Sequence, residues 1–258
     1  THDKAHILKH LSPKLEFNDI TDELICLGIF GPKSRNLISK ISNDDLTNEV
    51  FKFGTGKFIH IGLKKVWAQR LSYVGELGFE IYINNIDAKE IYQLIVEEGK
   101  NHKLSHCGSH AMDVMRMESG FLHWGHDISP EENQYEAGLH FAISYKKETN
   151  FIGKESLLKI KDKKLNRRFI MLSLKDSSPG HPLLLHEEPI YLEDKIIGRT
   201  TSGNYSFNYK KNLSFGYISS KYSNEELMEM NLYIEVAKQK YPAVVEVTPL
   251  KDKQARYL

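Results

Sequence analysis

Residues 66–83 read VWAQRLSYVGELGFEIYI, and they decide the fold of the first part of the chain. Apolar side chains alternate with other residues in Val66–Ser72 and again in Phe79–Ile83, which predicts two β-strands. The connection Gly75-Glu76-Leu77-Gly78 has a glycine at each end, and glycine adopts positive φ angles without steric cost. The stretch therefore predicts a hairpin-like pair of strands.

Glu80 lies inside the second of these runs, between Phe79 and Ile81. A carboxylate in an apolar strand must be solvated, paired with a cation or bound to a ligand. An ionised carboxylate accepts two hydrogen bonds at once, so it can bind a flat heterocycle that carries two neighbouring N–H donors. Because most strand glutamates are solvated surface residues, the residues alone leave both interpretations open.

The rest of the first 165 residues predicts one buried strand and three helices, at Leu24–Phe30, Lys33–Ser42, Asp87–Gly99 and Ser109–Ser119. Asp87 and Glu90 have the spacing of a capping box, and Gly99 is expected to end that helix. Strand pairs that alternate with helices in this way favour an α+β arrangement.

A basic connector, Lys159–Arg168, separates this region from the last third of the chain. A solvated linker is favoured over a nucleic-acid patch, because no aromatic residues are interleaved for base stacking. Short apolar runs follow it, at Phe169–Leu174, Pro189–Leu192, Ile196–Thr201, Leu213–Ile218, Leu232–Val236 and Ala243–Val247. They predict an antiparallel barrel or sandwich. We place the domain boundary near Leu165, which gives domains 1–165 and 166–258.

The composition limits the partners and the compartment. The chain has 258 residues, is 40% hydrophobic and carries a net charge of +1, so it has no global field for nucleic acid or anionic lipid. Cys26 and Cys107 form no CxxC motif, which favours a reducing compartment. No apolar run reaches the roughly 20 residues that span a bilayer. We expect no nucleic-acid or membrane partner, and a location in a bacterial cytoplasm or a mitochondrial matrix. Because residue 1 is Thr1, we also expect a processed or partial chain.

Six segments share the order and spacing of one family: SYVGELGFEIYI, RMESGFLHWGHDI, QYEAGLHFAI, NFIGKESLLKIK, LNRRFIMLSL and GRTTSGNYSFNYKKNLSFGYI. From about Phe17 to about Pro249 the chain resembles the aminomethyltransferase family, the T-protein of glycine cleavage. It is more similar still to the C-terminal half of dimethylglycine and sarcosine dehydrogenases. The resemblance implies an aminomethyltransferase-like α+β folate-binding domain, incomplete at its N-terminus, followed by an antiparallel β-barrel.

The resemblance also implies the residues that bind tetrahydrofolate. Glu80 would bind the pterin through both carboxylate oxygens, and Tyr73 matches a family tyrosine seven residues upstream of it. Ile81 and Tyr82 continue the same strand edge. Phe141 stands where related dehydrogenases carry an aromatic residue that lines the folate. The alternative for these aromatic residues is core packing.

Several family features are missing from this sequence. Met112 replaces the folate-binding arginine of the T-protein ARD motif, an arginine that the dehydrogenase branch also lacks. No segment matches the one that carries the family's catalytic aspartate, so the catalytic residues are unknown. No GxGxxG motif is present, so FAD is expected only in the flavin-binding half of relatives. His106 and His110 have no second ligand pair at zinc spacing, and we expect no metal.

The function implied by the resemblance is a tetrahydrofolate-dependent one-carbon transfer module that forms 5,10-methylenetetrahydrofolate. Its partners would be folate, a small N-methylated amine or aminomethyl donor, and a flavin oxidoreductase domain or subunit. The alternatives are a stand-alone aminomethyltransferase or other folate-dependent demethylase, a non-catalytic folate-binding protein, and a structural remnant that binds nothing. The folate-binding relatives that maintain iron–sulfur clusters carry a KGCYxGQE segment, where this chain reads NFIGKES without cysteine.

Overall fold

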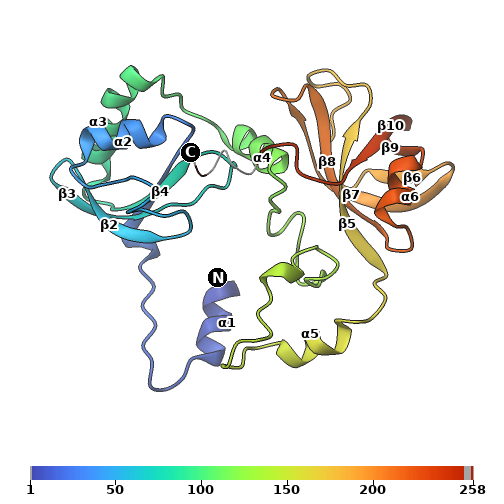
Figure 1. Cartoon of the computed structure of the whole chain (residues 1–258), viewed down its shortest axis with the longest axis horizontal. Coiled ribbons are helices and arrows are strands. Elements are labelled where there is room, and N and C mark those ends of the chain that lie inside the picture. The colour runs from blue at the N-terminus through green and yellow to red at the C-terminus, as the bar shows by residue number, and fades with distance from the viewer. Residues whose placement is uncertain (1, 253–256, 258) are drawn as a thin grey trace. The chain divides into compact units, whose positions relative to one another are not determined.

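The computed structural model describes residues 2–252 and 257, which form two compact units. The first unit comprises residues 2–72, 76–105 and 257, and the second comprises residues 73–75 and 106–252. Figure 1 labels most of the elements of each unit. Helices and strands are mixed in the first unit, and the last third of the chain forms a closed antiparallel barrel, so the predicted fold class is confirmed.

A four-stranded antiparallel sheet forms the centre of the first unit, in the order β1-β4-β3-β2. Its strands are β1 (Leu24–Phe30), β2 (Gly56–Ile61), β3 (Lys64–Gln69) and β4 (Gly78–Asn84). Trp67 pairs with Tyr82 in antiparallel register, which confirms the predicted hairpin-like pair. The strand predicted at Leu24–Phe30 is confirmed with the same bounds, but the expectation that it is buried was wrong, because β1 lies at the edge of the sheet and only Ile29 on it is buried.

One face of this sheet is covered by α2 (Ser34–Ile41) and α3 (Ala88–His102), as Figure 1 shows. Phe79, Ile81 and Ile83 of β4 point toward these helices and are fully buried. Because successive side chains of a strand alternate between faces, Glu80 and Tyr82 lie on the opposite face. We call that face the open face; its side chains include Cys26, Phe30, Phe58, Trp67, Gln69, Glu80 and Tyr82, together with Gly28, Gly56 and Gly78.

Two expectations about α3 were wrong. Asp87 precedes the helix but makes no side-chain capping bond, because its carboxylate instead accepts a hydrogen bond from Lys64 at 2.7 Å. The helix also continues past Gly99 to His102, and Lys103 with φ 60° ends it. Gly99 allows Leu104 to pack closely against the helix, because a Cβ at this position would lie 2.7 Å from the Cβ of Leu104.

The second unit contains a closed six-stranded antiparallel barrel in the order β10-β5-β8-β7-β6-β9. Its strands are β5 (Arg167–Leu174), β6 (Pro189–Leu192), β7 (Lys195–Ser206), β8 (Lys211–Ser219), β9 (Leu232–Val236) and β10 (Gln239–Glu246). All six predicted runs are confirmed as strands, although β5, β7, β8 and β10 are longer than expected. The division of the chain at residue 165 stays a prediction, and β5 begins two residues beyond it.

The remaining elements are mostly short helices: α1 (His2–His10), η1 (Thr21–Glu23), α4 (Ser109–Glu118), η2 (His140–Ala142), α5 (Lys154–Ile160) and α6 (Asn224–Glu229). The sequence predicted α4, which ends before Gly120 with φ 73°. It did not predict α6, which begins with a capping box formed by Ser223 and Glu226. Among the described helices, none combines the length and the apolar character that crossing a bilayer requires.

Candidate functional site

The carboxylate of Glu80 is held in place on the open face by a neighbouring tyrosine. The Tyr82 hydroxyl donates a hydrogen bond to Glu80 Oε2 at 3.1 Å. Burial, and then the charge of Glu80, raise the pKa of Tyr82 to about 12. The hydroxyl therefore stays protonated and acts as a donor at neutral pH. Within the described residues no hydrogen bond engages Glu80 Oε1, so this oxygen is available as an acceptor.

The open face beside Glu80 is formed by glycines and aromatic rings. Gly28 on β1 is the register partner of Glu80, and Gln69 is its partner on β3. The residue directly opposite Glu80 on β1 thus has no side chain, and the ring of Phe30 fills the space above it. Phe30, also on β1, lies on the same face, and its ring contacts the glycine positions next to Glu80. Sequence reasoning missed Phe30, although its place two residues from Gly28 puts both on one face of a strand.

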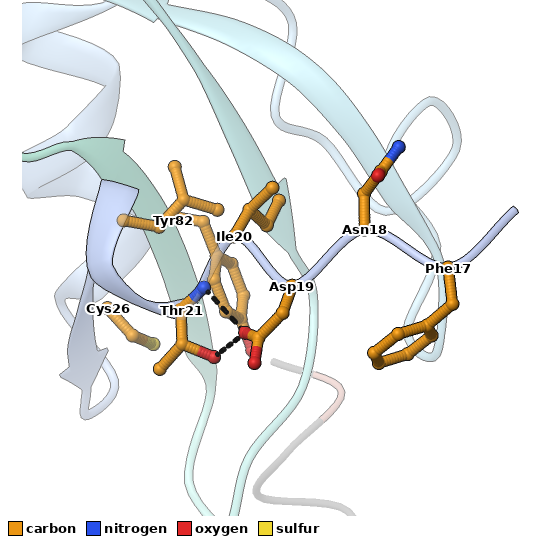
Figure 2. Close-up of a pocket in the computed structure, with 8 residues that line it drawn as sticks. Phe17, Asn18, Asp19, Ile20, Thr21, Cys26 and Tyr82 are labelled. Carbon is orange, nitrogen blue, oxygen red and sulfur yellow. Dashed lines mark hydrogen bonds between the residues drawn. The ribbon is translucent and has the colours of Figure 1, made fainter. Parts of the chain in front are cut away.

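A pocket of about 440 Å³ lies beside Tyr82, between β1, β4 and the segment that precedes β1. Figure 2 shows its lining, which consists of Phe17, Asn18, Asp19, Ile20, Thr21, Leu24, Cys26 and Tyr82. Tyr82 thus contributes its ring to the pocket and its hydroxyl to Glu80. The pocket and the carboxylate are two parts of one surface.

Asp19 and Cys26 are the ionisable groups of this pocket other than Tyr82, and neither is activated. Asp19 accepts hydrogen bonds from the Thr21 hydroxyl at 2.6 Å and from Lys4 at 2.9 Å. These bonds, of which the one from Thr21 has the larger effect, hold the pKa of Asp19 below its usual range. Asp19 is therefore ionised and already paired. Burial, and then the charge of Glu80, raise the pKa of the Cys26 thiol. Because the thiolate is the reactive form of cysteine, Cys26 is a poor nucleophile.

Ile81 lies on the other side of the sheet from its two neighbours. Its side chain is fully buried in the core beneath α2 and α3. The structure therefore brings Glu80 and Tyr82 together and turns Ile81 away. Any contact from Ile81 to a ligand on the open face would have to come from its backbone.

Tyr73 and Phe141 belong to the second unit. Tyr73 donates a hydrogen bond to the Leu122 carbonyl at 3.3 Å and stacks on Phe121, with ring centroids 6.3 Å apart and planes 12° from parallel. Burial raises the pKa of Tyr73, which keeps its hydroxyl protonated. Phe141 lies in η2 with 79% of its surface exposed, so it is not a core residue.

A buried carboxylate fixes the HWGHD loop of the second unit. Asp127 is ion-paired with Arg116 of α4 and accepts a hydrogen bond from the His123 backbone N–H at 2.9 Å. Thr201 and Ser202 of β7 donate their hydroxyls to it at 2.6 and 2.7 Å. Arg116 also pairs with Asp113 at 2.7 Å. The role of Asp127 was missed, because its partners on β7 lie far along the chain.

A β-bulge lets two consecutive residues reach the same carboxylate. Thr200 pairs with Gly216, but Ser202 pairs with Phe215, so Thr201 is an extra residue in β7. In a regular strand neighbouring side chains point to opposite faces. The bulge instead directs the hydroxyls of Thr201 and Ser202 toward Asp127, which gives the TTSG segment a structural role.

No metal centre is apparent in the part of the chain that the structure describes, since no three His, Cys, Asp or Glu side chains are grouped to hold an ion. His106 and Cys107 precede α4, His110 lies in its first turn, and all three are exposed. The open face around Glu80 is therefore the candidate site that the geometry supports.

Two family models match the chain. The model described as "GCVT N-terminal domain" matches residues 1–147, and the one described as "Glycine cleavage T-protein C-terminal barrel domain" matches residues 167–252. The second match includes all six strands of the barrel.

Similar proteins include two kinds of enzyme. Human mitochondrial dimethylglycine dehydrogenase is 36% identical over 238 residues, which are 92% of this chain and 27% of that protein. An aminomethyltransferase of Thermoanaerobacter pseudethanolicus is 34% identical over 210 residues, which are 81% of this chain and 55% of that protein. The chain thus spans between about a quarter and about half of the length of these relatives.

A solved structure shares the fold. The glycine cleavage system aminomethyltransferase T from Bartonella henselae matches with a TM-score of 0.76 and 20% sequence identity. The match covers 89% of this chain and 60% of that one. At this identity the likeness concerns the fold alone.

Proposed function

The chain belongs to the glycine cleavage T-protein family, and on that basis we propose that it binds tetrahydrofolate and serves in one-carbon transfer to it. The proposed product is 5,10-methylenetetrahydrofolate, and the proposed donor is a small N-methylated amine or an aminomethyl group. The family is folate-dependent, and the relatives include dimethylglycine and sarcosine dehydrogenases.

The observation that carries this proposal is the carboxylate of Glu80 on the open face. A pterin presents an exocyclic amine and a ring N–H side by side, and a carboxylate can accept a hydrogen bond from each. Tyr82 binds Glu80 through Oε2, and Glu80 lies on the open face of the sheet, where Oε1 has no hydrogen bond from the described residues. The residues present therefore fit a folate ring.

The chain's own residues would bind and orient rather than react. Bound tetrahydrofolate would supply the amine nucleophile that accepts the one-carbon unit. Glu80 would fix the ring, and Tyr82 would limit the rotation of the Glu80 side chain. Holding reactants in place and excluding water raises their effective concentration, which matters because an iminium exposed to water hydrolyses to formaldehyde.

Oxidation of the amine is proposed to occur elsewhere, on a flavin oxidoreductase domain or subunit. The sequence contains no GxGxxG motif, and the chain spans only 27% of human dimethylglycine dehydrogenase. We therefore expect the purified chain not to transfer electrons from dimethylglycine or sarcosine to an added acceptor. Electron transfer that depends on either substrate would overturn this part of the proposal.

Binding can be tested by anaerobic calorimetry with tetrahydrofolate at high protein concentration. Glu80→Gln preserves the shape but places an amide N–H against a pterin N–H, so one buried donor loses its acceptor. We expect a loss of about 1–3 kcal/mol, or on the order of tenfold or more in affinity. Glu97→Gln is the matched control, because Glu97 is an exposed residue of α3 in the same unit. Equal affinity of the wild type and Glu80→Gln, with circular dichroism unchanged, would remove Glu80 from the site.

A further inference from the structure

We propose that Phe30 is the residue on which the ring bound by Glu80 stacks, an inference that rests on the proposed function. Four positions of the open face form a rectangle across β1 and β4. Phe30 is opposite Gly78, and Gly28 is opposite Glu80. Phe30 and Glu80 therefore occupy one diagonal, and the two glycines occupy the other.

The ring of Phe30 fills the space that side chains at both glycine positions would take. A Cβ at Gly28 would lie 2.5 Å from Phe30 Cε2, and one at Gly78 would lie 2.3 Å from Phe30 Cδ1. Opposite edges of the ring thus contact the backbones of two strands. The ring lies low across the sheet, beside Glu80, and is only partly buried by the rest of the unit.

This placement suits a flat ligand. Diagonal neighbours on paired strands are about 7–8 Å apart, within reach of aromatic and long side chains. A bicyclic ring whose edge is held by Glu80 would extend over the ring of Phe30, and aromatic rings attract one another in such an offset arrangement. Glu80 would recognise the edge of the ligand, and Phe30 would recognise its face.

Phe58 provides a matched control on the same open face. It lies on β2, at the sheet edge farthest from β1, where it packs edge-on against Trp67 with ring centroids 5.1 Å apart. It is 57% exposed, so its replacement removes an aromatic ring from the open face without opening the core. Loss of binding specific to Phe30 would separate stacking beside Glu80 from a general effect of aromatic residues.

The test measures binding of two fragments by anaerobic calorimetry, 6-methyltetrahydropterin for the ring and p-aminobenzoylglutamate for the tail. Phe30→Leu is expected to weaken binding of the pterin and of tetrahydrofolate on the order of tenfold, as for other ring-on-aromatic contacts. Binding of p-aminobenzoylglutamate should not change. Phe30→Tyr and Phe58→Leu should both bind the pterin as the wild type does.

A further variant displaces the ring without removing it. Gly28→Ala places a methyl group where the ring now lies, so pterin binding should fall although Phe30 is retained. If Phe30→Leu does not fold, Gly28→Ala decides the question, because unchanged pterin affinity in that variant would overturn the stacking role. Unchanged pterin affinity in Phe30→Leu, or an equal loss in Phe58→Leu, would overturn the stacking role. If Glu80→Gln loses tetrahydrofolate and Phe30→Leu does not, only this inference fails, whereas absence of binding by the wild type would overturn the proposed function with it.

Discussion

The hydroxyl of Tyr82 donates to the carboxylate of Glu80, two residues away on the same strand, at 3.1 Å. Both side chains lie on the open face, while Ile81 between them is buried in the core. The ring of Tyr82 also lines the pocket formed by the segment before β1. Tyr82 is therefore a positioning residue for Glu80 as well as a wall of the neighbouring pocket.

Replacing Tyr82 should affect folate binding only through Glu80. Tyr82→Phe keeps the ring and removes the hydrogen bond, so we expect a loss of about 0.5–1.5 kcal/mol in the free energy of tetrahydrofolate binding. In a Glu80→Gln background the same change should cost little more, because the group that it positions has already been replaced. Calorimetry on the wild type, the two single variants and the double variant measures the coupling between Tyr82 and Glu80. Strictly additive losses would mean that Tyr82 contacts the ligand independently.

The pKa of Tyr82 gives a prediction for alkaline pH. Its value of about 12 in the folded chain lies above the ordinary value of about 10. Protonated Tyr82 therefore stabilises the fold fully below pH about 10, and this contribution is lost as the pH rises through about 12. In Glu80→Gln the pKa should fall but remain above the ordinary value, because burial is the larger cause. Ultraviolet titration of the wild type and of Glu80→Gln, each compared with the same protein carrying Tyr82→Phe, measures the pKa of Tyr82. An equal pKa in the two proteins would contradict the contact between Tyr82 and Glu80.

The ion pair of Arg116 and Asp127 should stabilise the second unit. Asp127→Ala leaves the buried guanidinium of Arg116 with the partly exposed Asp113 as its remaining ion-pair partner, and we expect a loss of about 3 kcal/mol in the free energy of unfolding. Urea unfolding in a Trp67→Phe background follows the second unit, because Trp124 is then the only tryptophan.

The control for this change is an exposed ion pair in the same unit. Glu187→Gln breaks the pair with Arg199, which is 2.7 Å long, and should cost less than about 1 kcal/mol. Similar losses in the two variants would show that burial of the Asp127 pair adds nothing to stability.

Close approach of β7 and β8 makes Gly198 sensitive to substitution. A Cβ there would lie 2.0 Å from the carbonyl oxygen of Tyr217, so Gly198→Ala should destabilise the barrel by about 1–3 kcal/mol. Gly108→Ser is the control, because a Cβ there meets no atom within 4 Å and serine is favoured at the start of a helix. Thermal unfolding measures the stability of both variants. A Gly198→Ala variant as stable as the wild type would contradict the close spacing of β7 and β8.

The barrel strands could be predicted because each is a short apolar run between turn residues. The edge position of Leu24–Phe30 could not, because it depends on the pairing of β1 with β4, which is distant in sequence. The capping box at Asp87 failed for a similar reason. Lys64, on a strand more than twenty residues earlier, binds the carboxylate that local spacing assigned to the helix.

The candidate site was predictable in part. Alternation along β4 places Glu80 and Tyr82 on one face, and the same alternation turns Ile81 to the other. The position of the Phe30 ring could not be predicted, because it depends on Gly78 across the sheet. The burial of Asp127 could not be predicted either, because it depends on Thr201 and Ser202, which the barrel brings to this loop residue.

The bulge at Thr201 makes the length of β7 as important as its composition. Beyond it, Ser206 donates its hydroxyl to the buried carboxylate of Glu118 at 2.6 Å, on the same side as the bond from Ser202 to Asp127. Deleting Thr201 would remove one of the two hydroxyls that bind Asp127, and an insertion or deletion between the bulge and Ser206 would turn Ser206 to the opposite face. Over evolutionary time this segment should therefore accept exchanges of one small hydroxyl residue for another, but neither an insertion nor a deletion.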